Sequence, residues 1–132
     1  MTNYCVFPNC NTRQKMISAL YEKYPSIKHS FIGRSACDRG IDSLHIGNTK
    51  NRVLYCGGFH GSEYLTVLAL LKFLEECAYS METNTKINGY NIGDSLKIRG
   101  LTIVPCVNPD GVEIAINGSA SAQRYQSLVE KV

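Results

Sequence analysis

The stretch YCGGFHGSEYLTVLALL, residues 55–71, passes from a strand-like pattern to a helix-like pattern within a few residues. Gly57 and Gly58 end the strand-like part, and His60 and Glu63 lie in the connection that follows. A connection that only had to turn would be served by Gly, Asn or Ser. A histidine and a glutamate, three residues apart at this junction, therefore indicate a place where something binds both side chains.

The segments around this junction alternate between strand and helix patterns. We predict strands at residues 27–35, 41–46, 52–56 and 101–107, and helices at 11–24, from about 62 onward and at 120–132. The apolar run at 52–56 predicts a strand buried on both faces. Residues 81–95 are polar and rich in Gly and Asn, which is typical of a surface excursion.

This order of segments predicts an α/β fold with a mixed, partly parallel sheet and helices on its faces. In the first helix, Asn11 or Thr12 can cap the N-terminus, and Met16, Ala19 and Leu20 form one apolar face. Because 132 residues are enough for one ordinary domain, we expect a single unit.

The amino-acid composition argues against some classes of function. Hydrophobic residues make up 44% of the chain and charged residues 19%, as in a soluble globular protein. The net charge of +3 is dispersed apart from a short run around Lys97 and Arg99, which argues against a nucleic-acid binder. No apolar run is long enough to span a membrane, and the first residues lack a signal-peptide pattern. We therefore expect a cytoplasmic location.

The six cysteines, at positions 5, 10, 37, 56, 77 and 106, show no paired CxxC spacing for a zinc–thiolate site. A disulfide framework is not expected without an export signal. Cys56, Cys77 and Cys106 lie in apolar segments, where free cysteine packs as a small buried hydrophobe. We predict free thiols in a reducing compartment.

The spacing of His60 and Glu63 suits a metal ion. Side chains three residues apart lie on the same side of a helical turn, so both can reach one ion. Imidazole nitrogen and carboxylate oxygen are both zinc ligands. A simpler interpretation stays open on spacing alone, in which Glu63 complements a helix N-terminus and His60 caps a turn.

A second loop with polar side chains follows the predicted strand at residues 101–107. The sequence NPDG, residues 108–111, has the composition of a tight turn, with Pro109 fixing the turn and Gly111 permitting positive φ. In an α/β sheet, ligands collect beyond the carboxyl ends of strands, so the two loops are expected at one edge.

Together, GGFHGSE, VPCVNPDGVE and the hairpin IGRSACDRGIDSLHIG resemble the zinc carboxypeptidase family of metallopeptidases over about residues 31–113. The resemblance implies the N-terminal portion of a zinc carboxypeptidase-like (phosphorylase/hydrolase-like) fold. It implies His60 and Glu63 as zinc ligands, and Arg39 as a residue that lines outer substrate subsites. Asp38 stands where the family usually has a glycine. The NPDG residues are implied to form the floor of the cleft.

The run NPDGVEIAING looks more like bacterial members that act on cell-wall peptides, including γ-D-glutamyl-diamino-acid peptidases, than like digestive enzymes. The implied activity is hydrolysis of a peptide or isopeptide bond by metal-activated water. A peptide substrate, a cell-wall peptide among the candidates, is the implied partner.

In the family, the third zinc ligand, a histidine, and the glutamate general base come later than NPDG, beyond Val132 here. His29 and His45 lie in strand-like segments, where satisfied histidines are expected, and are not assigned as ligands. The resemblance thus implies that residues 1–132 are the incomplete, N-terminal part of one metallopeptidase catalytic domain, with no catalytic residue of its own. Its partner would be the missing C-terminal portion or another copy of the chain. A sheet lacking later strands should expose an edge and an apolar face.

Two other interpretations stay open. Related deacylases use an HGxE-type site, so a zinc amidoacylase fits the first motif. A degenerate, non-enzymatic protein could instead bind peptides or a partner through its exposed sheet. Dependence on zinc separates these interpretations.

Overall fold

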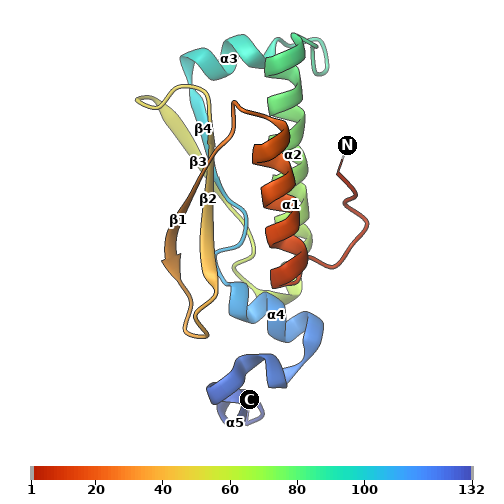
Figure 1. The fold of residues 1–132 in the computed structure, drawn as a ribbon, viewed down its shortest axis with the longest axis vertical. Helices are drawn as coiled ribbons and strands as arrows, with labels where there is room; N and C mark the ends of the chain where they lie inside the picture. The colour runs from red at the N-terminus through yellow and green to blue at the C-terminus, as the bar shows by residue number, and fades with distance from the viewer. Residues whose placement is uncertain (1, 132) are drawn as a thin grey trace.

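The computed structural model describes residues 2–131 and contains one four-stranded sheet with helices around it (Figure 1). The strands are β1 Lys28–Arg34, β2 Gly40–Ile46, β3 Arg52–Cys56 and β4 Gly100–Val104. The α-helices are α1 Cys10–Lys23, α2 Leu65–Thr83, α3 Ile92–Ile98, α4 Pro109–Asn117 and α5 Gln126–Val129, with 3₁₀ helices η1 Gly61–Glu63 and η2 Ser119–Tyr125. No helix in the described part of the chain has the length and apolarity needed to cross a membrane.

The strand order is β1-β2-β4-β3, with β1–β2 and β2–β4 antiparallel and β3–β4 parallel. Helices α1 and α2 lie side by side against one face of this sheet (Figure 1). The prediction of an α/β fold with a mixed, partly parallel sheet is confirmed. The parallel pair β3–β4 brings the ends of residues 52–56 and 100–104 to one edge, where the two motif-bearing loops begin.

The core lies between the two helices and the sheet. The fully buried Ile17 and Leu20 of α1 pack in the same cluster as Leu71 and Leu74 of α2 and Ile103 of β4. Burying a large aliphatic side chain stabilises the fold by about 1.5–3 kcal/mol, so this cluster supplies much of the folding free energy.

Helix α1 begins one residue earlier than predicted. The side chain of Asn9, rather than Asn11 or Thr12, caps it by accepting a hydrogen bond from the Thr12 N–H at 2.9 Å. Ala19 was predicted on the apolar face but is exposed, because Ile17 takes the buried position instead.

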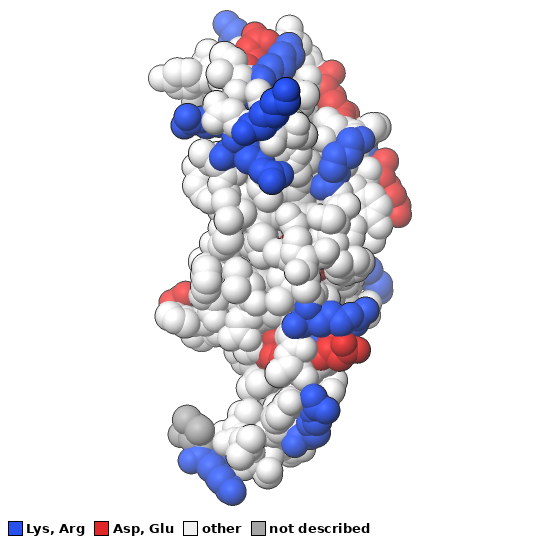
Figure 2. Space-filling view, turned by 90° about the vertical axis from the view of Figure 1, so that its left-hand side faces the viewer, with Lys and Arg blue, Asp and Glu red and all other residues white. Residues whose placement is uncertain are grey.

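The prediction that residues 52–56 are buried on both faces is wrong. β3 is an edge strand of the sheet, and Leu54 and Tyr55 are 61% and 48% exposed. The sheet face away from α1 and α2 is open among the described residues, and its middle is nearly free of charge (Figure 2). Lys and Arg side chains gather at the α3 end of this view, where Lys50, Arg52 and Lys97 are exposed.

Two helices occupy segments predicted as irregular. The excursion at 81–95 ends in α3, whose N-cap Asn91 accepts from the Asp94 N–H at 3.1 Å. The NPDG sequence is not an isolated turn but the start of α4, with Asn108 as N-cap and Pro109 at its first position. The segment 120–132, predicted as one helix, consists of η2, which is interrupted at Gln123 (φ 53°), and the short helix α5 that follows it. Val132 lies outside the described residues.

All six cysteines are free, as predicted. Cys77 and Cys106 are buried, and burial raises the pKa of the Cys77 thiol to about 11. Cys56 differs from its prediction: it is exposed because it ends the edge strand β3.

Candidate metal centre

His60 and Glu63 meet just beyond the carboxyl end of β3. His60 precedes the short helix η1, and Glu63 is the last residue of that helix. Their side chains are 77% and 57% exposed, and His60 Nδ1 lies 3.2 Å from Glu63 Oε1. The structure therefore brings together the pair that the spacing predicted, and their role as metal ligands stays a prediction.

The separation of these two atoms fits one shared zinc ion. Ligands of a tetrahedral ion at about 2.0–2.2 Å lie roughly 3.3–3.6 Å apart. The 3.2 Å found here is the length of a direct hydrogen bond between the two side chains and lies just below this range. Exposure leaves both side chains accessible to an ion. No group of three or more His, Cys, Asp or Glu side chains within residues 2–131 is arranged to hold a metal ion.

The loop that carries His60 is held by the loop after β4. Gly57 N–H donates to the carbonyl of Val104 at 3.0 Å, and the Gly57 carbonyl accepts from Val107 N–H at 2.9 Å. One residue further, the Gly58 carbonyl accepts from the backbone N–H of Asn108 at 2.9 Å. The pairing of β3 with β4 thus continues past the ends of both strands.

Thr66 forms hydrogen bonds on both sides of His60. Its hydroxyl accepts from the Gly58 N–H at 2.8 Å and donates to the Glu63 carbonyl at 2.8 Å. Because Gly58 has φ +60° and a Cβ there would press on Cys106, a glycine is required for this bend. Thr66 thereby fixes the backbone on the Glu63 side of the candidate site.

A close approach of two glycines joins η1 to α4. A Cβ added to Gly61 would collide with the backbone carbonyl of Gly111. The HGSE turn therefore rests directly on the NPDG turn, and the prediction that both motifs lie at one sheet edge is confirmed.

Arg39 lies in a network centred on Asp110. Asp110 accepts hydrogen bonds from Arg39 Nη1 at 2.7 Å, Ser35 Oγ at 2.7 Å and Cys37 N–H at 3.0 Å. Burial alone would raise the pKa of Asp110, but the hydrogen bonds from Arg39, Ser35 and Cys37 lower it. Arg39 Nη2 also donates to the Ser121 carbonyl at 2.7 Å. The substrate role of Arg39 stays a prediction, and the observed role is to hold the β1–β2 hairpin against α4.

The residue before Arg39 adopts the conformation that a glycine prefers. Asp38, which replaces the family's usual glycine, has φ 61°, in the left-handed region where Asp is tolerated. Its side chain is 82% exposed and pairs with Arg34 at 3.4 Å.

The two remaining histidines are hydrogen-bonded within the fold, as expected. His29 Nε2 lies 2.8 Å from Asp42 Oδ1. His45 Nδ1 lies 3.0 Å from Thr102 Oγ1, and its Nε2 lies 3.2 Å from the Gly47 carbonyl.

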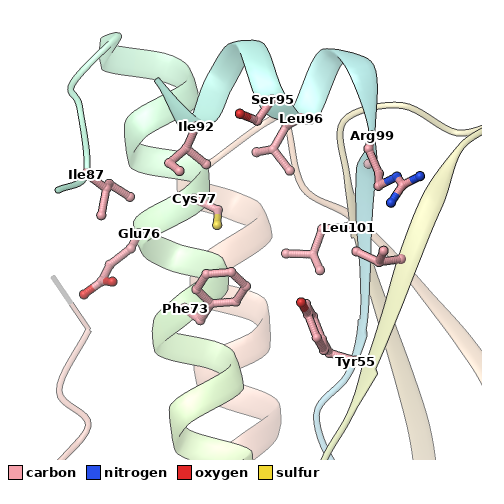
Figure 3. A pocket seen from close by; sticks show the side chains of 12 residues that line it. Tyr55, Phe73, Glu76, Cys77, Ile87, Ile92, Ser95, Leu96, Arg99 and Leu101 are labelled. Carbon is pink, nitrogen blue, oxygen red and sulfur yellow. The ribbon is translucent and has the colours of Figure 1, made fainter. Parts of the chain in front are cut away.

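An apolar pocket of about 270 Å³ lies apart from the candidate metal centre, between β3, α2 and α3 (Figure 3). Phe73 and Cys77 of α2, Leu96 of α3 and Tyr55 of β3 face it, and Arg99 and Glu76 lie at its margin. It is at the α3 end of the molecule, whereas η1 contacts α4 at the opposite end (Figure 1). The pocket therefore does not belong to the His60–Glu63 site.

Fold and site together define an α/β protein with a candidate metal centre at the carboxyl ends of its parallel strands. A sequence model described as zinc carboxypeptidase matches residues 14–128. The chain belongs to the zinc carboxypeptidase family.

Relatives are similar over part of their length. The gamma-D-glutamyl-L-diamino acid endopeptidase 1 of Lysinibacillus sphaericus is 34% identical over 102 residues, which are 77% of this chain and 26% of that protein. A zinc carboxypeptidase of Saccharothrix mutabilis subsp. capreolus is 31% identical over 96 residues, 68% of this chain and 21% of that protein. The chain thus spans less than a third of the length of these curated relatives.

Solved structures support the fold. Bovine thrombin-activatable fibrinolysis inhibitor, in complex with tick carboxypeptidase inhibitor, superposes with a TM-score of 0.72 at 23% identity, covering 88% of this chain and 36% of that chain. At this identity the likeness concerns the fold alone.

Proposed function

We propose that this chain contributes to a zinc-dependent metallopeptidase that hydrolyses a peptide or isopeptide bond. The observation that carries the proposal is the 3.2 Å approach of His60 Nδ1 to Glu63 Oε1 at the end of a strand, in a chain of the zinc carboxypeptidase family. When bound, zinc would polarise the scissile carbonyl and activate water.

In this proposal His60 and Glu63 hold the ion through Nδ1 and a carboxylate oxygen. A catalytic zinc takes three protein ligands, and hydrolysis also needs a carboxylate base. We propose that a histidine ligand and a glutamate base come from outside residues 1–132, in a later part of the same polypeptide. Alone, residues 1–132 should then bind zinc weakly and hydrolyse little.

The proposed substrate is a peptide with a γ-D-glutamyl-diamino-acid linkage, as in cell-wall peptides. The similarity to the Lysinibacillus sphaericus endopeptidase supports this choice over a digestive-type substrate. Arg39 is proposed as a substrate contact, although a substrate carboxylate would compete with Asp110, which lies 2.7 Å from Arg39 Nη1.

The test is zinc content and peptide hydrolysis by the intact natural protein and its His60→Ala and Glu63→Ala variants. Both variants should lose zinc and at least 100-fold in kcat/KM. Because both side chains are exposed, the free energy of unfolding without zinc should change by no more than about 0.5 kcal/mol. His45→Gln, which alters a histidine bound within β2 and β4, is the matched control and should keep zinc. Zinc retained by His60→Ala would contradict the proposal.

A non-enzymatic binding module is the second candidate, favoured by the exposed edge strand β3. Intact mass of the natural polypeptide in its source cells separates the two candidates. A mass near twice 14.6 kDa leaves room for the third ligand and the base, whereas a mass of 14.6 kDa favours the binding module. A zinc amidoacylase would instead cleave N-acyl amino acids and spare the γ-D-glutamyl peptide.

A further inference from the structure

We infer that Asn108 is a positioning residue for His60, acting through the backbone carbonyl of Phe59. This inference rests on the proposed function, because it concerns how the proposed zinc ligand is held.

Backbone hydrogen bonds join the two loops. The Gly57 carbonyl accepts from the N–H of Val107, and the Gly58 carbonyl accepts from the N–H of Asn108, each at 2.9 Å. The next carbonyl in this series belongs to Phe59, and the next backbone nitrogen belongs to Pro109. Proline has no N–H, so the backbone cannot make this hydrogen bond.

The Asn108 side chain makes it instead. Its Nδ2 donates to the Phe59 carbonyl at 3.0 Å across a sequence separation of 49 residues. The Phe59 carbonyl belongs to the planar peptide group that includes the nitrogen and Cα of His60. Holding this carbonyl therefore fixes the plane from which His60 projects toward Glu63.

The Asn108 amide is held at both ends. Its Oδ1 accepts from the Gly111 N–H at 2.8 Å and caps α4, while its Nδ2 faces the Phe59 carbonyl. If the amide were reversed, its NH₂ group would face the Gly111 N–H, donor against donor, and its oxygen would face the Phe59 carbonyl, acceptor against acceptor. The hydrogen bonds therefore define the orientation of the amide. A Cβ at Gly111 would press against this side chain, so the glycine makes room for Asn108 in this position.

Asn108→Asp separates the two tasks of this side chain. Aspartate caps a helix as well as asparagine does, so α4 should be retained. A carboxylate cannot donate to the Phe59 carbonyl and repels it, so the hold on His60 is lost. Asn91→Asp is the matched control, because Asn91 caps α3 in the same way and lies at the other end of the molecule.

The experiment is a titration of the 132-residue chain with Zn²⁺, followed by the NMR signals of the His60 ring and assigned with His60→Ala. The expected result is zinc affinity about tenfold weaker in Asn108→Asp, in line with the 10–100-fold effects of residues that support metal ligands. Asn91→Asp should match the wild type, and the Tm of both variants should stay within a few degrees of it.

Equal zinc affinity in Asn108→Asp and wild type would overturn the inference and leave the proposed function standing. Because a two-ligand site should bind zinc weakly, the titration extends to millimolar Zn²⁺. A wild-type His60 ring that still does not respond would overturn both the inference and the assignment of His60 as a zinc ligand. If Asn108→Asp fails to fold, Asn108→Ser replaces it, because serine also caps a helix but is too short to reach the Phe59 carbonyl.

Discussion

At the scale of single residues, Asp110 is the most connected side chain near the site. It receives one charged and two neutral hydrogen bonds from the segment 35–39, which belongs to a different motif. Arg39 and Asp110 are 12% and 15% exposed, so solvent screens their ion pair only in part. The aspartate of NPDG therefore stabilises the β1–β2 hairpin instead of facing an open cleft.

Replacing Asp110 should expose this contribution and its pH dependence. Asp110→Asn should lower the free energy of unfolding at pH 7 by roughly 2 kcal/mol, the range for hydrogen bonds to charged groups. Because folding lowers the pKa of Asp110, its contribution is complete above the unfolded value of about 3.9 and is lost as the pH falls through the folded value. Urea unfolding at pH 7 and pH 3 should thus show a difference between wild type and variant that shrinks at pH 3.

Asp38→Asn is the control for that measurement. Asp38 is 82% exposed, and its contact with Arg34 is a surface ion pair. We expect a change below about 0.5 kcal/mol at either pH. If Asp110→Asn lowers the free energy of unfolding by the same amount at pH 7 and pH 3, the charge of Asp110 is not the source of its stabilising effect.

At the scale of elements, the contact of η1 with α4 depends on the absence of a side chain. Gly61→Ala should force η1 away from Gly111 and lower the free energy of unfolding by about 1–3 kcal/mol, as overpacking does. Gly33→Ala is the control, since no atom lies within 4 Å of a Cβ there and the change should be nearly neutral. Thermal unfolding checks both variants, and equal Tm values would contradict the close approach.

The sequence contained the signals for some elements and lacked them for others. Asn108 followed by Pro109, with Asp110 in the first turn, is typical of a helix start, so α4 was open to prediction from local signals. The hydrogen bond from Asn108 to Phe59 was not, because it joins residues 49 apart whose neighbourhood is set by β3–β4 pairing. His60 and Glu63 were found because their spacing is local; Thr66 and Asn108 were missed because each acts on the backbone of another segment.

At the scale of the whole molecule, β3 is the element for which the sequence was misleading. Its apolar run predicts burial, but burial depends on what packs beside the strand, and β3 has a single neighbour among the described strands. The pattern of a central strand and the position of an edge strand are therefore combined in residues 52–56.

An apolar edge strand should promote self-association of the 132-residue chain. Leu54→Lys should weaken this association by about 1 kcal/mol, or roughly fivefold, because like charges then face each other across paired edges. Leu65→Lys is the control: Leu65 is 69% exposed but lies on α2, so its replacement should have a smaller effect. Sedimentation velocity over a concentration series measures the self-association of both variants. An equal effect of the two replacements would show that association does not depend on the β3 edge.

The parallel pairing of β3 with β4 also bears on when the loop that carries His60 forms during folding. In a chain synthesised from its N-terminus, His60 leaves the ribosome well before Asn108, its support 48 positions later, has been made. Contacts across such a separation form late in folding, after local helices. We therefore expect the loop that carries His60 to take its final conformation only after β4 has paired with β3. A metal ion that needs both ligands in place would then bind after folding and not during synthesis.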